Sequence, residues 1–143
     1  MLKRYLLLLN FVCLGCGNGE PPRLAGFPVH GKLLVDGKPA VRAEVTFHSK
    51  TPLADATGRP LIPYAIVGTD GMFNVMTYAD GDGAPVGEYV LTVTWPRIKV
   101  EGGEEIIGAD RLGDRFSNVT HPAAMFHVEA RDNEIPTIEL KSR

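Results

Sequence analysis

The stretch from residue 29 to residue 47 constrains the fold most, because apolar side chains recur at every second position on both sides of a turn signal. These side chains share one face of each run: Leu33 and Val35 before the turn, and Ala43, Val45 and Phe47 after it. Successive side chains of a strand point to opposite faces, so the pattern predicts two half-buried strands joined as a hairpin. Asp36-Gly37 supplies the positive φ that a tight turn needs, and Pro39 delays the second strand.

Further short strands are predicted where apolar, β-branched or aromatic residues lie between turn signals: 64–68, 72–78, 88–95, 125–130 and 137–141. Thr69-Asp70-Gly71 separates the first two and predicts a second hairpin. The clearest alternation is that of 88–95, which places Trp95 on the core face. With 16 Gly and 11 Pro the chain disfavours long helices, and seven short strands predict an antiparallel sandwich or barrel. Segment 97–121 predicts a loop tip at Gly102-Gly103 and a helical turn, rather than a full helix, over 110–116.

Residues 1–16 are predicted to be an export signal rather than part of the fold. Lys3 and Arg4 precede an apolar run over residues 5–12, which is too short to span a bilayer as a permanent helix. Leu14-Gly15-Cys16 then resembles a bacterial lipobox, in which the cysteine is lipidated and becomes the mature N-terminus. An ordinary cleaved signal and an uncleaved membrane anchor are the alternatives.

The cysteine count and the following residues fit this prediction. Both cysteines of the chain, Cys13 and Cys16, lie in the signal, so the rest of the chain has no disulfide and no thiol chemistry. Gly17 stands where an Asp would retain a lipoprotein of enteric bacteria at the inner membrane, which favours the outer membrane. Residues 17–27 are rich in Gly and Pro and are predicted to be a flexible tether, followed by one β-sandwich domain over 28–143.

Three segments in order resemble the carboxypeptidase regulatory-like domain, which has the transthyretin-like (prealbumin-like) fold. Residues 29–47 carry V-x-G-x-L-x-V-D-G-x-P followed by A-x-V-x-F, residues 67–75 resemble T-D-x-x-G-x-F, and residues 83–93 resemble G-x-P-x-G-x-Y-x-V-x-V. The resemblance implies an all-β, seven-stranded antiparallel Greek-key β-sandwich, transthyretin-like or immunoglobulin-like. The layout is also similar to short secreted lipoproteins of planctomycete-type bacteria. Members of the family are mostly accessory or adhesive modules, so the resemblance carries no catalytic residues over.

Charge and motifs exclude several classes of function. The formal net charge is −2 and no basic stripe alternates with aromatic residues, so no binding of nucleic acid is predicted. The chain has no G-x-S-x-G motif, and its four histidines do not have the spacing of metal ligands: His30, His48, His121 and His127. We therefore expect no enzymatic activity, no cofactor and no metal centre.

Two pairs of residues remain as candidate ligand-binding groups. Tyr64 and Tyr78 are candidates for an exposed aromatic platform that stacks on sugar rings. Asp80 and Asp82, on a Gly-rich loop, are candidates for a Ca²⁺ site, although the loop does not complete an EF-hand pattern. An Asp-Gly pair also serves turns for purely conformational reasons.

The sequence therefore predicts a non-enzymatic, lipid-anchored β-sandwich module of the cell envelope, with a structural or protein-interaction role. A carbohydrate-binding module that uses exposed aromatics is the first alternative, and a small-ligand or Ca²⁺ binder is the second. The expected partners are the membrane, through the N-terminal lipid, and an envelope protein or glycan. Any binding site is expected in the loops 49–63 and 97–121, away from the opening hairpin.

Overall fold

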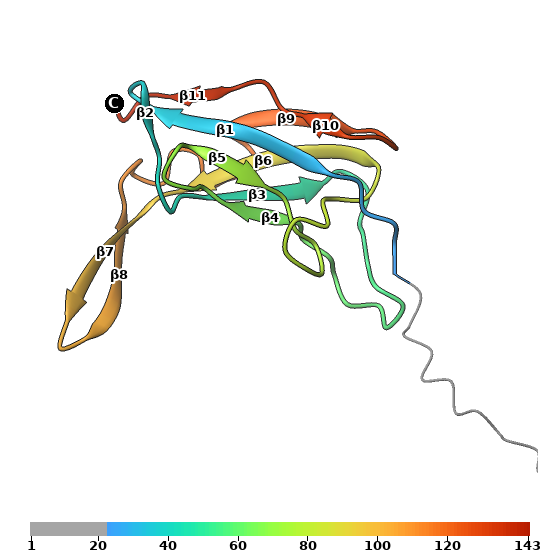
Figure 1. Cartoon of the computed structure of the whole chain (residues 1–143), viewed down its shortest axis with the longest axis horizontal. Helices are drawn as coiled ribbons and strands as arrows, with labels where there is room; N and C mark the ends of the chain where they lie inside the picture. The colour runs from blue at the N-terminus through green and yellow to red at the C-terminus, as the bar shows by residue number, and fades with distance from the viewer. Residues whose placement is uncertain (1–22) are drawn as a thin grey trace, which may run out of the picture.

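Residues 23–143 are described in a computed structural model, and they contain eleven strands and no helix (Figure 1). None of these residues therefore belongs to a helix that could cross a membrane. The predicted all-β class is confirmed for this part of the chain. The predicted signal, Cys16 and residues 17–22 of the predicted tether lie outside the described residues.

The first sheet is built around β1 (Val29–Val35), whose side chains alternate between buried and half-buried. On one side β1 pairs antiparallel with β2 (Lys38–Pro39) and β5 (Met72–Asn74). On the other side it pairs parallel with β10 (Asn133–Glu134) and β11 (Ile138–Leu140). The sheet is therefore mixed, and the prediction of a purely antiparallel sandwich is wrong here.

The second sheet is antiparallel, with the order β4 (Tyr64–Ile66), β3 (Glu44–Ser49), β6 (Gly87–Thr94) and β9 (Ala124–Val128). Its inner face packs against that of the first sheet. On this inner face, Phe47 of β3 meets Tyr89 of β6 edge to face, with 5.9 Å between the ring centroids. The Tyr89 hydroxyl donates to the Pro85 carbonyl oxygen at 2.7 Å, so the buried phenol is satisfied. Its burial raises the pKa of Tyr89 to about 12.

The opening hairpin is much shorter than predicted. Asp36 (φ 51°) and Gly37 (φ 77°) form the expected tight turn, but β2 pairs with β1 over only two residues. The chain then crosses to the other sheet, where β3 pairs with β4 and β6. The predicted second hairpin is present only in part: β4 lies in the second sheet and β5 in the first, but Tyr64 and Met76 still exchange two backbone hydrogen bonds.

An unpredicted hairpin, β7 (Pro96–Glu101) and β8 (Glu104–Asp110), projects from one end of the sandwich (Figure 1). Its tip is the predicted Gly102-Gly103, and both glycines have positive φ. The Arg42 guanidinium donates to both carboxylate oxygens of Glu105 at 2.8 Å, which ties the hairpin to the body.

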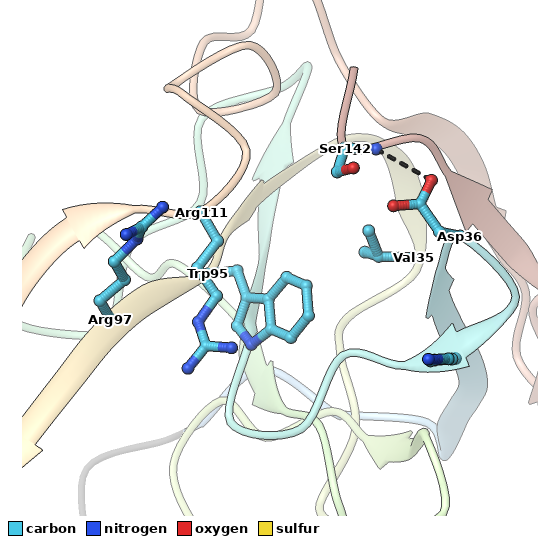
Figure 2. A pocket seen from close by; sticks show the side chains of 7 residues that line it. Val35, Asp36, Trp95, Arg97, Arg111 and Ser142 are labelled. Atoms are coloured by element: carbon cyan, nitrogen blue, oxygen red, sulfur yellow. Dashed lines mark hydrogen bonds between the residues drawn. The ribbon is translucent and has the colours of Figure 1, made fainter.

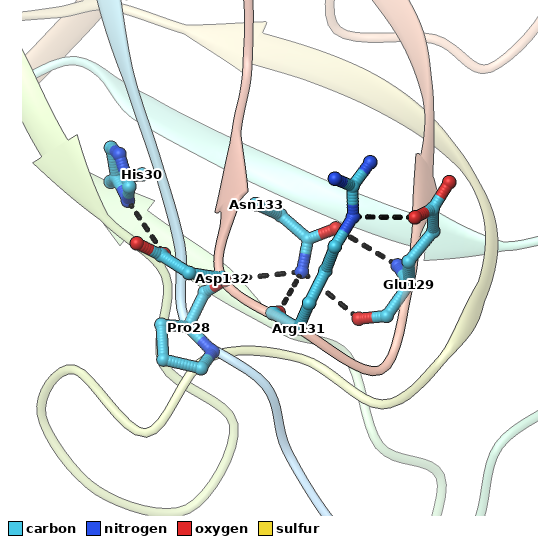
Figure 3. A network of polar contacts seen from close by, with 6 residues as sticks. All are labelled: Pro28, His30, Glu129, Arg131, Asp132 and Asn133. Carbon is cyan, nitrogen blue, oxygen red and sulfur yellow. Dashed lines mark hydrogen bonds and ion pairs between the residues drawn. The ribbon is translucent and has the colours of Figure 1, made fainter.

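A buried asparagine holds the turn after β9 (Figure 3). Asn133 is 5% exposed, and its Nδ2 donates to the carbonyl oxygens of Arg131 (2.6 Å), Glu129 (3.0 Å) and Pro28 (3.2 Å). Its Oδ1 accepts from the Glu129 amide at 2.9 Å. One side chain thus joins the β9–β10 turn to the residue that precedes β1.

Acid should weaken the loop around Asp55. Hydrogen bonds from the Thr57 hydroxyl and the Arg59 amide lower the pKa of Asp55 to about 2. A lowered pKa stabilises the fold above the unfolded value, near 4, and this contribution is lost as pH falls through about 2. Urea midpoints measured between pH 5 and pH 2 should therefore fall less for Asp55→Asn than for the unaltered chain. An identical fall for both chains would contradict this assignment.

Candidate functional site

A hollow of about 650 Å³ lies at the end of the sandwich from which β7 and β8 project. Figure 2 shows its lining, which comes from the β1–β2 turn, the start of β7, the residue after β8 and the C-terminal segment: Val35, Asp36, Lys38, Trp95, Arg97, Arg111 and Ser142. Four other hollows on the described surface have volumes between 270 and 370 Å³. The described chain begins at the opposite end of the sandwich (Figure 1).

Trp95 forms one wall of this hollow. Its amide donates to Asp110 Oδ1 at 2.6 Å, and its carbonyl oxygen accepts from the Arg111 amide at 2.8 Å, so the backbone is held on both sides. The indole Nε1 donates to the Val41 carbonyl oxygen at 2.9 Å. The ring therefore has its polar atom satisfied and can offer a ligand only its carbon surface.

The prediction that Trp95 belongs to the core is only half right. Tyr89, Leu91 and Val93 on the same face of β6 are fully buried, whereas Trp95 is half-buried and packs against the edge of the core. The reason is its position: it follows the last residue of β6, beyond the point where the two sheets cover each other.

The lining of the hollow contains three cations, one of which contacts the indole. The Arg111 guanidinium lies 4.8 Å from the ring centroid, and Lys38 and Arg97 complete the basic lining. Within residues 23–143, none of these three side chains has a carboxylate at ion-pair distance. Among the other basic side chains of residues 23–143, five are paired with a carboxylate: Arg42, Lys50, Arg59, Arg131 and Lys141.

The only carboxylate in the lining, that of Asp36, already has partners. Hydrogen bonds from Ser142 lower the pKa of Asp36, and the nearby charges of Lys141 and Arg115 lower it further. This negative charge is thus matched by the C-terminal segment rather than by the cations beside Trp95. The hollow presents three side-chain cations and one compensated carboxylate.

The two predicted tyrosines do not line this hollow. Tyr64 is 39% exposed on β4, the edge strand of the second sheet. Tyr78 is half-buried, and its hydroxyl accepts from the Leu24 amide at 3.2 Å while the Arg23 guanidinium lies 5.3 Å from its ring centroid. Tyr78 thus contacts the start of the described chain, and the structure gives the tyrosines different surroundings.

The two residues predicted to bind calcium, Asp80 and Asp82, also have different surroundings. Asp80 is exposed, whereas the Asp82 carboxylate accepts the amides of Thr77 (2.7 Å), Tyr78 (2.9 Å) and Ala79 (3.0 Å). In the described part of the chain, no three His, Cys, Asp or Glu side chains are grouped to hold a metal ion. The geometry assigns Asp82 to the turn itself.

Asp82→Ala should therefore lower the free energy of unfolding by about 1–3 kcal/mol, because three turn amides lose their acceptor. Asp80→Ala is the matched control and should change it by less than about 0.5 kcal/mol. Urea unfolding with EDTA and again with calcium measures both effects. Equal losses for the two variants in EDTA would contradict the turn role of Asp82, and a loss that appears only with calcium would indicate a metal site.

The predicted binding loops account for part of the hollow. Arg97 and Arg111 come from the predicted segment 97–121, but Val35, Asp36 and Lys38 come from the opening hairpin, which was expected to lie away from any site. The sequence signal for Trp95 was its place directly before Pro96, where a strand must end or bend. Nothing in the spacing of the cations indicated that they would meet.

Comparisons with known proteins give little further guidance. No protein-family model and no curated protein matches the chain. A crystal structure of a candidate carbohydrate-binding protein from Pseudomonas aeruginosa is 12% identical, with a TM-score of 0.43, and the match covers 82% of this chain and 91% of that one. A 9R-lipoxygenase from Cyanothece is 13% identical, with a TM-score of 0.44, over 85% of this chain and 18% of the lipoxygenase. Neither likeness is close enough to carry an argument about function.

Proposed function

We propose that this chain is a non-enzymatic binding module, displayed at the cell envelope by a lipid on Cys16, which holds its ligand in the Trp95 hollow. The observation that carries the proposal is the indole, whose carbon surface faces an open hollow of about 650 Å³. Ligand sites in proteins commonly have volumes of about 300–1,000 Å³, with aromatic walls and a few polar groups that orient the ligand.

The chemistry of the lining supports binding rather than catalysis. Its one hydroxyl is that of Ser142, and no histidine is among the lining residues to act as a base for it. The remaining groups are cations and apolar surface. These groups orient and hold a ligand without changing its covalent bonds.

The placement of the hollow supports display from a surface. The described chain starts at one end of the sandwich, and β7 and β8 project from the other (Figure 1). The hollow lies beside the bases of β7 and β8. A module tethered through residues 17–22 would carry its ligand site on the end that points away from the membrane.

The three motifs that resemble the carboxypeptidase regulatory-like domain cover β1 to β3, β5 with the turn before it, and β6 with the loop before it. We propose that the sandwich is a transthyretin-like variant in which the projecting β7–β8 hairpin is an addition.

Trp95 is the only tryptophan of the chain, so its fluorescence tests the binding proposal directly. Titration of the purified full chain with envelope and plant-type oligosaccharides should shift its emission with at least one of them. Tyr64→Ala should leave that shift unchanged, because Tyr64 does not line the hollow. An unchanged emission throughout the panel, or a shift lost in Tyr64→Ala, would refute the assignment of this site.

The anchor has its own matched test in the two cysteines. Cys16→Ser should move the protein from the membrane fraction to the soluble fraction, because the lipid acceptor is gone. Cys13→Ser should leave it in the membrane fraction, since Cys13 leaves with the signal. Fractionation followed by immunoblotting reads both, and membrane retention of the Cys16→Ser protein would contradict a lipid anchor there.

Protein binding through the β7–β8 hairpin is the second candidate function. Val100 (68% exposed) and Ile107 (75% exposed) lie on one face of this hairpin, as the pairing of Ile98 with Ile107 places them. Exposed apolar side chains that gather on a projecting element are typical of contact surfaces. Val100→Ser with Ile107→Ser should abolish cross-linking to an envelope protein if this candidate is correct, and should leave the Trp95 titration unchanged.

A further inference from the structure

We infer that the ligand of the Trp95 hollow is an acidic saccharide, one whose sugar rings carry carboxylate or sulfate groups. This inference rests on the proposed function and specifies the chemistry of the same site. The juxtaposition that supports it is an indole in the wall of the hollow together with three lining cations that have no ion-pair partner among residues 23–143.

The charges are arranged for an anion that comes from outside the chain. Within residues 23–143, the side chains of Lys38, Arg97 and Arg111 make neither an ion pair nor a hydrogen bond to the protein. A guanidinium offers five N–H donors in a planar fork that matches a carboxylate or a sulfate, and an ammonium adds three more. The formal net charge of the whole chain is −2, so this concentration of positive charge is local.

The indole identifies a ring-bearing ligand rather than a bare anion. Because the Val41 carbonyl oxygen occupies Nε1–H, the ring contributes only apolar surface, and such a surface pairs with the C–H face of a pyranose. The Arg111 guanidinium lies over the indole ring, 4.8 Å from its centroid, so a pyranose would stack on the other face of the indole. The N–H donors of this guanidinium would then serve carboxylate or sulfate groups of the ligand.

The spacing of charge favours a sugar polymer over a nucleic acid. A nucleic-acid strand carries a phosphate at every nucleotide and is held by a basic track that follows its backbone. The lining has one indole and three cations, and the Asp36 carboxylate lies on its rim. A polymer with one acidic group on each sugar ring fits this limited set of partners.

Matched pairs of oligosaccharides test the inference on the full chain, with Trp95 emission as the signal. Oligogalacturonate should bind, and its methyl ester, which keeps the rings but removes the charges, should bind at least about tenfold more weakly. A sulfated galactan oligosaccharide and its desulfated form make the second pair and distinguish sulfate from carboxylate. Binding to the acidic members should weaken as salt rises.

Substitutions of the lining cations then test which of them bind the acidic groups of the ligand. Arg97→Gln and Lys38→Gln should each weaken binding of the acidic oligosaccharide by about tenfold and weaken binding of its neutral form much less. Arg59→Gln is the matched control, because Arg59 lies in the 55–59 loop and pairs with Asp55. Thermal midpoints that match the unaltered chain would show that the variants fold.

The outcomes separate this inference from the proposed function. Equal affinity for an acidic oligosaccharide and its neutral form would overturn the acidic ligand and leave the binding module standing. No response to any saccharide would overturn both. Tighter binding of a single-stranded oligonucleotide than of every acidic oligosaccharide would also overturn the inference, because the partner would then be a nucleic acid.

Discussion

Replacing Asn133 with aspartate should lower the free energy of unfolding by about 3 kcal/mol or more, although the two side chains have the same shape. The Asn133 amide nitrogen faces three carbonyl oxygens, those of Pro28, Glu129 and Arg131 (Figure 3). A buried carboxylate in this place has no N–H group to donate, and it faces the same three carbonyl oxygens. The turn after β9 and the entry to β1 would lose their common support.

Urea unfolding at pH 7 measures the loss, and Asp132→Asn provides the matched control one residue away. The Asp132 side chain is 71% exposed, so its substitution should cost less than about 0.5 kcal/mol. The loss in Asn133→Asp should shrink as pH falls, because a protonated carboxyl can again donate to a carbonyl oxygen. A loss that is small at pH 7, or that grows at low pH, would contradict the network.

The positions of the core residues were predictable from alternation alone. Leu33, Val35, Val45, Phe47 and the inward side chains of β6 are all buried, as a period of two requires for strands that cover a core. The turn at Asp36-Gly37 was equally predictable, because few other pairs adopt two consecutive positive φ angles. Local pattern therefore specifies which face of each strand is buried and where a turn occurs.

The partner of each strand was not predictable in the same way. Runs 29–35 and 44–48 both bury their odd-numbered side chains. Two such runs can line one core either as neighbours in the same sheet or from opposite sheets. The structure uses opposite sheets, because the chain crosses between them directly after the two-residue β2. The parallel pairing of β10 and β11 with β1 joins residues about 100 positions apart, which no local pattern encodes.

The candidate site also depends on a strand pairing that local pattern does not predict, that of β7 with β8. Trp95 and Arg111 meet because β7 and β8 form a hairpin that returns the chain to the end of β6. The charged side chains of 96–101 and the exposed ones of 104–110 obscured this hairpin, since it buries almost nothing. The sandwich end is therefore assembled by an element whose sequence does not have the pattern of a core strand.

Gly83→Ala should lower the free energy of unfolding by about 3 kcal/mol or more, and Gly81→Ala by only about 1 kcal/mol. Both glycines have similar positive φ angles, 80° and 72°, so the backbone strain of an added Cβ is comparable. At Gly81 a Cβ would meet no atom within 4 Å, whereas at Gly83 it would overlap the Phe27 carbonyl oxygen. The difference between the two variants measures that close approach.

The same approach joins the start of the domain to its core. The Phe27 amide donates to Ala84 O at 2.9 Å, and the Ala84 amide donates to Phe27 O at 3.0 Å, next to Gly83. Gly83→Ala should therefore also expose the Phe27 and Ala84 amides to hydrogen exchange, while Gly81→Ala leaves them protected. Urea unfolding and exchange read by mass spectrometry check both expectations. Equal losses in the two variants would mean that the start of the domain is not held against residues 83–84 as described.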